Sequence, residues 1–297
     1  MSTTCIIFNP VARGDKARDL FDHLKRRCDG IVLKPTQAQG HARSLAKEAV
    51  EEGFTTVVAA GGDGTINEVV NGLLDAEDGF VKTRLAVLPI GTINVFAREL
   101  GIPMKWRDAW DLLQGNREIE IDVPSVEFAG PQGIQNRAFV QLAGTGWDAR
   151  AVELVDWELK KKIGFFAYVL SGFKALGEPA ASITVRTSKD VATGNLVVIG
   201  NGRYYAGSYP VFHRANLSDG LLDICVFEEC RWSCVPRYTL KFLMNQMFKP
   251  GAYTYFQAAE ATLSTETSAG LQLEGELVGR LPARFYINPK KLRVVVG

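Results

Sequence analysis

Two glycine-rich segments carry polar side chains that could hold a phosphate group. The first is GGDGTINE, residues 61–68, which directly follows the apolar run VVAA. Glycine lets a ligand approach the backbone closely, and N–H groups at the start of a following helix suit a phosphate. Asp63 would repel a phosphate unless a cation or a sugar hydroxyl lies between them, which points to Mg²⁺. The segment therefore indicates a metal-assisted phosphate site.

A structural role for the same segment stays open, because Asp63 could cap a tight strand–turn–helix connection. The segment is not a Walker A loop, since no Gly-Lys-Ser/Thr follows, and it is not the dinucleotide-binding pattern GxGxxG. We expect Thr65 to cap a helix that begins at Ile66, with Asn67 in its first turn.

The second glycine segment repeats this design. LPIGTINVFARELG, residues 88–101, predicts a strand, a turn at Gly91-Thr92 and a helix with Asn94 in its first turn. Asn9, in the segment FNP, adds a polar residue at the end of a third strand. Because ligands bind at the carboxyl ends of the strands in open α/β sheets, the three strand ends would line one crevice.

Two kinds of elements position these residues. The first ~120 residues alternate apolar runs with helical patterns, which predicts βαβ units and a mostly parallel sheet. After Pro124 short alternating β segments predict an antiparallel sandwich or barrel-like domain. We expect residues 117–128, REIEIDVPSVEF, to form one strand, and residues 270–279, GLQLEGELVG, to form another that carries Glu276.

Composition limits the class of protein. The chain has 297 residues, of which 46% are hydrophobic, which is enough for more than one packed domain. A net charge of +1 gives no global field, so we expect no nucleic-acid partner. The five cysteines form no disulfide framework, so we expect a cytoplasmic location. Cys230 and Cys234 have no flanking Cys or His pair, which favours ordinary packing over a zinc site.

Contact with a membrane is expected to be peripheral. The start of the chain, MSTTCIIFNP, has neither a basic region nor a long apolar run, so we expect no signal peptide. No apolar run reaches about 18 residues, so we expect no transmembrane segment. The best candidate for transient lipid contact is residues 160–176, KKKIGFFAYVLSGFKAL, although the composition of this segment favours a core helix with a solvated basic start. The sequence indicates no oligomeric state.

In combination, NP, GGDGTINEVVNG and PIGTINVFAREL resemble the catalytic domain shared by diacylglycerol kinases, sphingosine kinases and bacterial soluble lipid kinases. The resemblance spans nearly the whole chain. Its further segments follow in order: EIDV, GTGWDARAV, GNGRYYAG, NLSDGLLDICVF and LEGELVG.

The resemblance implies a fold and a reaction. The fold would be α/β plus β: an N-terminal NAD-kinase-like ATP-binding α/β domain, residues 1–124 with a returning segment 285–297, and a C-terminal β-sandwich-like lipid-substrate domain, residues 125–284. The implied reaction moves the γ-phosphoryl group of ATP to the hydroxyl of a diacylglycerol-like lipid, as in phospholipid biosynthesis. The active site would lie in the interdomain cleft.

The resemblance also implies residue roles. Glu276 would be the catalytic base, Asp63 would organise Mg²⁺ and the phosphates, and a metal would bind at Asn216, Asp219 and Leu221 through backbone carbonyls and one carboxylate. From the residues alone, Asp219-Gly220 instead predicts a structural hairpin turn. The candidate ATP-binding residues are Asn9, Thr36, Gly61, Gly62, Asp63, Gly64, Thr65, Ile66, Asn67, Thr92 and Asn94.

Two departures from the family pattern leave alternatives open. Val95 stands where the family often has Asp, and the usual DGE motif is EGE here, with Glu274 first. One alternative is an NAD kinase or other small-molecule kinase on the same fold. The other is a non-catalytic regulator that binds lipid or nucleotide.

Overall fold

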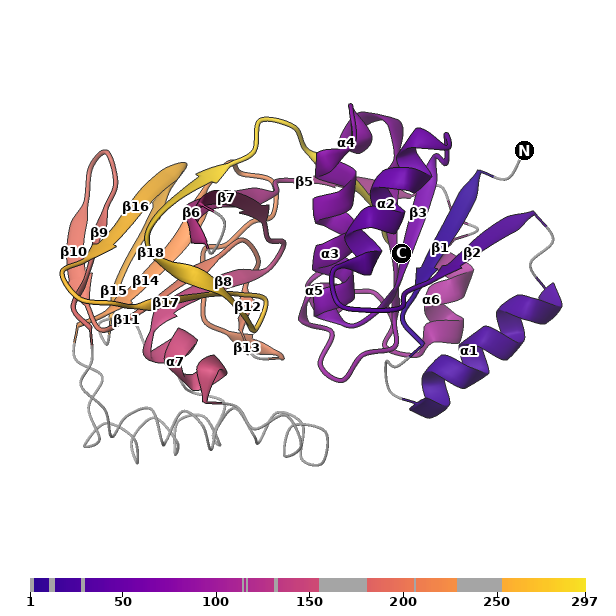
Figure 1. Cartoon of the computed structure of the whole chain (residues 1–297), viewed down its shortest axis with the longest axis horizontal. Coiled ribbons are helices and arrows are strands. Elements are labelled where there is room, and N and C mark those ends of the chain that lie inside the picture. The colour runs from indigo at the N-terminus through magenta and orange to yellow at the C-terminus, as the bar shows by residue number, and fades with distance from the viewer. Residues whose placement is uncertain are drawn as a thin grey trace. The chain divides into compact units, whose positions relative to one another are not determined.

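The computed structural model describes residues 3–10, 14–27, 30–113, 115, 117–130, 133–154, 181–205, 207–228 and 253–297. The chain divides into two compact units, which are taken in turn below (Figure 1). Unit 1 comprises Met1–Val123 with Asn288–Gly297, and unit 2 comprises Pro124–Ile287.

Unit 1 is built on a mixed sheet with the strand order β2-β1-β3-β4-β19-β5 among the described residues. Strands β1, β2, β3 and β4 are parallel to one another, β19 is parallel to β4, and β5 is antiparallel to β19. All six residues of β3 are buried, as the unbroken apolar run predicts. The bounds are β1 (Thr4–Phe8), β2 (Ile31–Pro35), β3 (Thr56–Gly61), β4 (Arg84–Pro89), β5 (Glu118–Ile121) and β19 (Leu292–Val295).

Helices cover both faces of this sheet. Figure 1 shows α2 and α3 on one side and α1 and α6 on the other. Helix α2 buries positions at the helical spacing i, i+3, i+4, i+7 and i+8, which makes one apolar face. The bounds are α1 (Gly14–Arg27), α2 (His41–Glu51), α3 (Asp63–Asp75), α4 (Gly79–Lys82), α5 (Val95–Glu99) and α6 (Trp106–Leu112).

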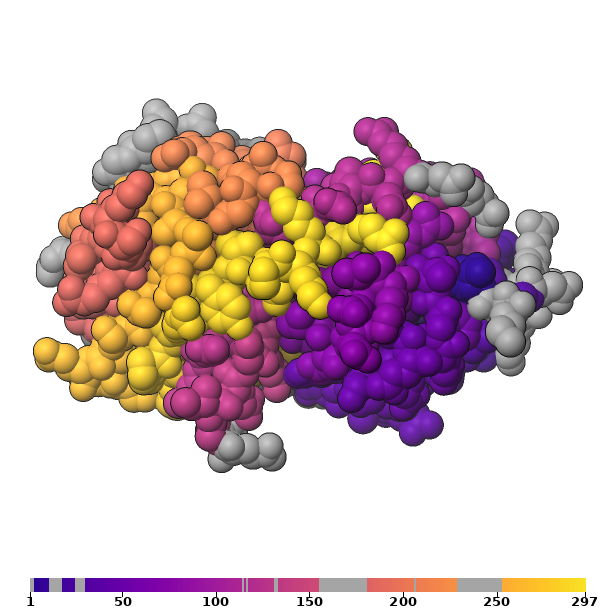
Figure 2. Space-filling view, turned by 90° about the horizontal axis from the view of Figure 1, so that it is seen from above, coloured from indigo at the N-terminus to yellow at the C-terminus, as the bar shows by residue number. Residues whose placement is uncertain are grey.

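The C-terminal strand completes the sheet of unit 1. Val294 of β19 pairs with Leu85 of β4 on one side and with Ile119 of β5 on the other. Lys290, just before β19, forms an ion pair with Asp78 at the start of α4, in which Nζ of Lys290 lies 2.7 Å from Oδ1 of Asp78. In Figure 2 the yellow C-terminal atoms accordingly lie against purple atoms of unit 1.

Unit 2 is dominated by one large antiparallel sheet, with 11 strands in the described part of the chain. Alternating side chains from its strands form the main apolar core, which includes Phe128, Phe139 and Phe285. The bounds of this sheet's strands are β6 (Pro124–Gly130), β7 (Gly133–Ala138), β8 (Leu142–Gly146), β9 (Ile183–Arg186), β10 (Val191–Gly194), β11 (Leu196–Gly200), β14 (Leu222–Phe227), β15 (Thr254–Ala258), β16 (Glu260–Thr265), β17 (Gly270–Leu273) and β18 (Glu276–Ile287). The unit also contains the short pair β12 (Tyr204–Tyr205) and β13 (Tyr209–Pro210), and the helix α7 (Trp147–Glu153).

The expectation of one strand over residues 117–128 is wrong. The segment contains the end strand of one sheet, β5, and the first strand of the other, β6. Pro124 begins the second strand, where the missing N–H costs the sheet no ladder hydrogen bond. The chain passes from unit 1 to unit 2 at this proline.

Several predictions fall on residues outside the described ranges. They are the lipid-contact segment 160–176 and the cysteines Cys28, Cys230 and Cys234. Cys5 and Cys225 are buried free thiols. Within the ranges described above, no helix has both the length and the apolar composition needed to cross a membrane.

Candidate active site

The carboxyl ends of β1, β2, β3 and β4 lie at one edge of the unit 1 sheet and are linked by backbone hydrogen bonds. The amide of Asn9 donates to the carbonyl of Ala60 at 3.0 Å, and the amide of Thr36 donates to the carbonyl of Phe8 at 2.8 Å. The amide of Gly91 donates to the carbonyl of Gly61 at 3.2 Å. The structure therefore brings the predicted polar strand ends together at the edge where ligands bind in open α/β sheets.

The two glycine segments lie backbone against backbone. A Cβ added to Gly91 would lie 2.4 Å from Cα of Gly62, and a Cβ added to Gly61 would lie 2.4 Å from Oγ1 of Thr65. Both distances are too short for a side chain, so the glycines permit a contact that no other residue type would allow. The sequence predicted close approach by a ligand, whereas in the structure Gly91 is required for the close approach of the two loops and Gly61 for the close packing of Thr65 in its own segment.

Asp63 caps a helix, but the helix belongs to the other glycine segment. Its Oδ1 accepts the backbone N–H of Phe96 in α5 at 3.1 Å, and the N–H groups of Val95 and Asn94 also hydrogen-bond to this carboxylate. Burial raises the pKa of the Asp63 carboxyl above its usual range, and these N–H groups oppose the rise. A partly desolvated carboxylate is thus held where the two segments meet.

The helix boundaries at both segments differ from the expectation. Helix α3 begins at Asp63 with Gly62 as its N-cap, so Thr65 lies inside the first turn and is not the cap. Oγ1 of Thr65 instead accepts a hydrogen bond of 3.4 Å from Nδ2 of Asn9. Asn94 is the N-cap of α5, with a left-handed φ of 54°, and does not lie in the first helical turn.

Asn94 leaves one polar atom unsatisfied at the junction. Its Nδ2 donates to the carbonyl of Gly91 at 3.1 Å, while the buried Oδ1 has no hydrogen-bond partner among the described residues. This Oδ1 would lie 2.6 Å from a Cβ added to Gly91, so it faces the contact between the two loops. A buried acceptor without a donor is costly, and a ligand N–H or O–H would relieve that cost.

The remaining predicted ATP-binding residues differ in exposure. Thr92 is exposed, and Thr36, Gly64 and Asn67 are partly exposed. The side chain of Ile66 is fully buried in unit 1, so only its backbone could serve a ligand.

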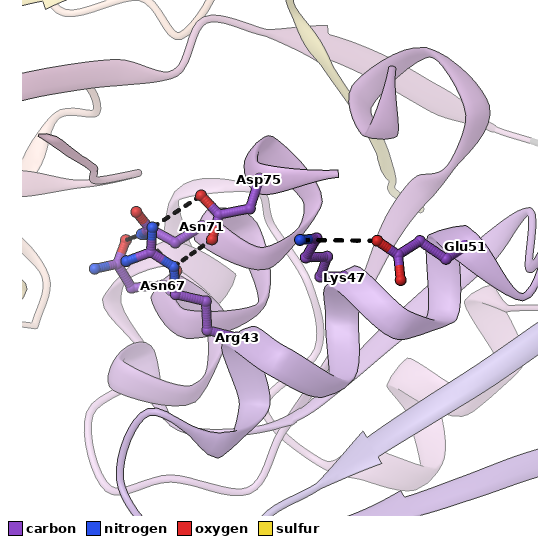
Figure 3. A network of polar contacts seen from close by, with 6 residues as sticks. All are labelled: Arg43, Lys47, Glu51, Asn67, Asn71 and Asp75. Atoms are coloured by element: carbon purple, nitrogen blue, oxygen red, sulfur yellow. Dashed lines mark hydrogen bonds and ion pairs between the residues drawn. The ribbon is translucent and has the colours of Figure 1, made fainter. Parts of the chain in front are cut away.

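Helix α3 is fixed against α2 by contacts that the sequence reasoning missed (Figure 3). Arg43 points toward Asp75, and their two hydrogen bonds measure 2.5 and 2.8 Å. A Cβ added to Gly72 would lie 2.1 Å from the carbonyl oxygen of Arg43, so the two helices pack with close backbones. Glu68 accepts the N–H groups of Gly40 and Ala42, at 2.8 and 3.0 Å, and so caps α2 from α3.

In unit 2, Glu276 lies just after a tight turn and not in the middle of one continuous strand as expected. Strands β17 and β18 form a hairpin in which Leu273 pairs with Glu276. The two turn residues, Glu274 and Gly275, have positive φ values of 52° and 81°. Two successive positive φ values are typical of a type I′ turn. Glu276 therefore begins β18, where its side chain is partly exposed.

The variant glutamate of the EGE motif has a defined contact. Oε1 of Glu274 accepts the backbone N–H groups of Val140 at 2.8 Å and Gln141 at 2.7 Å. The N–H of Leu142 approaches the same oxygen at 3.4 Å. The carboxylate thus anchors the turn that precedes Glu276 to the residues before β8.

The predicted metal residues form a turn that leads into β14. The N–H of Leu221 donates to Oδ1 of Asp219 at 3.0 Å, and the N–H of Asp219 approaches the carbonyl of Asn216 at 3.4 Å. The preceding strand, β13, pairs with β12 and not with β14, so the predicted hairpin at Asp219-Gly220 is wrong. No group of three or more His, Cys, Asp or Glu side chains suited to a metal occurs in the described ranges.

Models of two known domains match the chain. The diacylglycerol kinase catalytic domain matches residues 3–126, and the YegS C-terminal NAD kinase beta sandwich-like domain matches residues 141–296. The predicted fold class, an α/β domain followed by a β-sandwich-like domain, is confirmed.

Curated relatives and solved structures agree with these matches. The diacylglycerol kinase of Staphylococcus haemolyticus (strain JCSC1435) is 27% identical over 300 residues, which cover 96% of this chain and 85% of the relative. The diacylglycerol kinase of Staphylococcus aureus (strain JH9) is 28% identical over 294 residues, which cover 94% of this chain and 88% of the relative. A solved structure of a diacylglycerol kinase from Bacillus anthracis str. Sterne has a TM-score of 0.77 and 22% identity, over 100% of this chain and 97% of that one.

These matches follow the order of the sequence motifs and cover both units. The predicted resemblance is confirmed, and the chain belongs to the diacylglycerol kinase catalytic-domain family.

Proposed function

We propose that this chain, as a lipid kinase of its family, transfers the γ-phosphoryl group of ATP to the hydroxyl of a diacylglycerol-like lipid. The observation that carries the proposal is the contact between the two glycine segments of unit 1, with the Asp63 carboxylate at their junction. Phosphoryl transfer needs positioning and charge neutralisation more than covalent chemistry; this junction offers backbone N–H groups for the first and, in Asp63, a carboxylate that would hold a neutralising cation for the second.

In this proposal the carboxyl edge of the unit 1 sheet binds ATP. The backbone N–H groups at the start of α3, in the segment of Gly61, Gly62 and Gly64, would bind the phosphate oxygens. The unsatisfied Oδ1 of Asn94 would accept a donor from the nucleotide. Asn9, Thr36, Thr65, Asn67 and Thr92 would complete the contacts from neighbouring strand and helix ends.

Mg²⁺ fits the oxygen donors that the chain offers. Asp63 would hold it near the phosphates, and the turn formed by Asn216, Asp219 and Leu221 would offer one carboxylate with backbone carbonyls, the hard oxygen ligands that Mg²⁺ prefers. When bound, the metal would neutralise charge on the phosphates. The partly buried position of Asp63 supports the first assignment, because a carboxylate held against its burial cost gains from a nearby cation.

Glu276 is the proposed base. Its place at the start of β18, directly after an anchored turn, gives a partly exposed carboxylate on a fixed backbone. Such a carboxylate can accept the proton of an attacking hydroxyl within hydrogen-bond reach. In this proposal Asp63 serves the phosphates and Glu276 serves the lipid hydroxyl.

The acceptor is proposed to be a membrane lipid reached by peripheral, transient contact from the cytoplasm, as in phospholipid biosynthesis. The two Staphylococcus relatives are diacylglycerol kinases, which supports diacylglycerol for this role. The test is transfer of radiolabelled γ-phosphate from ATP in the presence of Mg²⁺ to a panel of lipids and to NAD. Labelling of a lipid supports the proposal. Labelling of NAD alone would show a small-molecule kinase, and ATP binding without transfer to any acceptor would show a regulator.

A further inference from the structure

The turn that presents Glu276 is held by a buried glutamine. The N–H of Gly275 donates to Oε1 of Gln272 at 2.7 Å, and Gln272 is only 1% exposed. Gln272 precedes the turn in β17, so its side chain folds back onto the backbone that follows. The position of the Gly275 amide, one residue before Glu276, therefore depends on which end of the glutamine amide faces the turn.

A buried aspartate sets the orientation of that amide. Nε2 of Gln272 donates to Oδ2 of Asp148 at 2.5 Å, and the hydroxyl of Tyr205 donates to Oδ1 of the same carboxylate. The N–H of Gly275 can only donate, so Oε1 of Gln272 must face the turn, and Nε2 then faces Asp148, which accepts from it. The hydrogen bonds thus link the Asp148 carboxylate through the Gln272 amide to the turn, with each donor and acceptor fixed.

The surroundings of Asp148 leave space for this carboxylate and little else. A Cβ added to Gly144 in β8 would lie 1.7 Å from Oδ2 of Asp148 and 2.8 Å from Nε2 of Gln272. Burial raises the pKa of the Asp148 carboxyl, and the hydrogen bonds from Tyr205 and Gln272 oppose the rise. A costly buried carboxylate is thus retained where it orients a single amide.

We propose that Asp148 and Gln272 are positioning residues for Glu276, acting through the N–H of Gly275. This inference rests on the proposed function, in which Glu276 accepts the proton of the lipid hydroxyl. Neither residue needs to touch the substrate in this role. Their contribution is to fix the backbone from which the Glu276 side chain extends.

The test removes the acceptor for the Gln272 amide and then restores that acceptor without the charge. In Asp148→Ala, Nε2 of Gln272 and the hydroxyl of Tyr205 both lose their acceptor. The Gln272 amide is then no longer held with Oε1 toward the N–H of Gly275. In Asp148→Asn, Oδ1 can accept from Nε2 of Gln272 while Nδ2 donates to the hydroxyl oxygen of Tyr205, so the hydrogen bonds that lead to the turn are kept.

Two measurements follow the change. In Asp148→Ala we expect kcat for lipid phosphorylation to fall by about 10- to 100-fold, because small misplacements of a reacting group cost that much. KM for ATP should change less than about twofold, because the altered contacts do not bind ATP. Hydrogen exchange at the Gly275 amide should accelerate more than about tenfold. Asp148→Asn should keep both kcat and exchange within a few-fold of the wild type.

A matched control is Asp190→Asn, in an exposed turn of unit 2, which should leave kcat and the exchange at Gly275 unchanged. The inference is overturned if Asp148→Ala keeps wild-type kcat and exchange, or if Asp148→Asn loses as much as Asp148→Ala. Failure of the proposed function looks different. In that case the wild type labels no lipid, or Glu276→Gln keeps full turnover. Hydrogen exchange at the Gly275 amide does not depend on catalysis, so it still decides whether Asp148 and Gln272 fix the turn.

Discussion

Asp63 combines two roles in this account, and two substitutions separate them. Its Oδ1 accepts the N–H of Phe96 at 3.1 Å, which caps α5, and its charge is proposed to organise the metal-bound phosphates. Asp63→Ala removes both the acceptor and the charge. Asp63→Asn keeps a carbonyl oxygen that can accept from Phe96 but removes the charge.

The expected magnitudes follow from these contacts. Loss of the cap in Asp63→Ala should lower the free energy of unfolding by about 1–2 kcal/mol, as for other helix caps. In Asp63→Asn the retained acceptor and the relief of a buried charge should limit the loss to less than about 1 kcal/mol. Both variants should lose turnover by about 100-fold or more, because the carboxylate proposed to hold Mg²⁺ near the reacting phosphates is removed.

The assay pairs urea unfolding, followed by circular dichroism, with γ-phosphoryl transfer to diacylglycerol at saturating ATP. Glu68→Gln is the matched control, because Glu68 caps α2 from the same helix and has no proposed contact with ATP. It should lower stability by about 1 kcal/mol and keep turnover within a few-fold. Wild-type turnover in Asp63→Asn would refute the role in phosphate binding, and equal stability of Asp63→Ala and the wild type would refute the capping role.

Three further substitutions test other contacts. Gly91→Ala places a Cβ 2.4 Å from Cα of Gly62, so we expect a loss of about 1–3 kcal/mol in urea unfolding and weaker ATP binding by calorimetry; wild-type values for both would contradict the packing argument. Glu274→Gln weakens the charged hydrogen bonds to the N–H groups of residues 140 and 141, and should cost about 1–2 kcal/mol in the same unfolding measurement. For Asp223, burial raises the pKa to about 6, with opposing hydrogen bonds from Tyr255 and Gln257. The folded pKa lies above the unfolded value, so stability should fall by up to about 3 kcal/mol as the pH rises from about 4 to above 6, and Asp223→Asn should flatten that fall in unfolding curves measured across this range.

The sequence was sufficient for the fold class because its signals are local. The apolar run before Gly61 is the fully buried strand β3, and the change of pattern after Pro124 coincides with the start of the antiparallel sheet. The glycine segments also indicated the correct strand ends, because glycine is needed there for a close approach of two backbones. The family could be identified because its motifs occur in order along nearly the whole chain.

The errors arose where distant contacts decide local structure. The N–H that Asp63 accepts belongs to Phe96, 33 residues away, so no local pattern shows that this carboxylate serves α5. The same contact holds the backbone so that α3 starts at Asp63, despite the low helix propensity of Gly64. Thr65 therefore lies inside the helix and does not cap it.

The hairpin before Glu276 was missed for a similar reason. Asn-Gly and Asp-Gly are the usual type I′ sequences, and Glu-Gly is a weak signal because glutamate rarely adopts positive φ. The Glu274 carboxylate offsets that cost through N–H groups 134 and 133 residues earlier in the chain, at Val140 and Gln141. No sequence motif marks Asp148 or Gln272, because their proposed role depends on the hydrogen bond between them, which joins residues 124 positions apart.

The central claim is that Glu276 accepts the proton of a lipid hydroxyl during transfer from ATP. The most direct measurement is the single-turnover rate of γ-phosphate transfer to diacylglycerol in mixed micelles, for the wild type and for Glu276→Gln. The account predicts rapid labelling by the wild type and a loss of about 100-fold or more in the variant, with ATP affinity unchanged. Equal rates in the two proteins would contradict it.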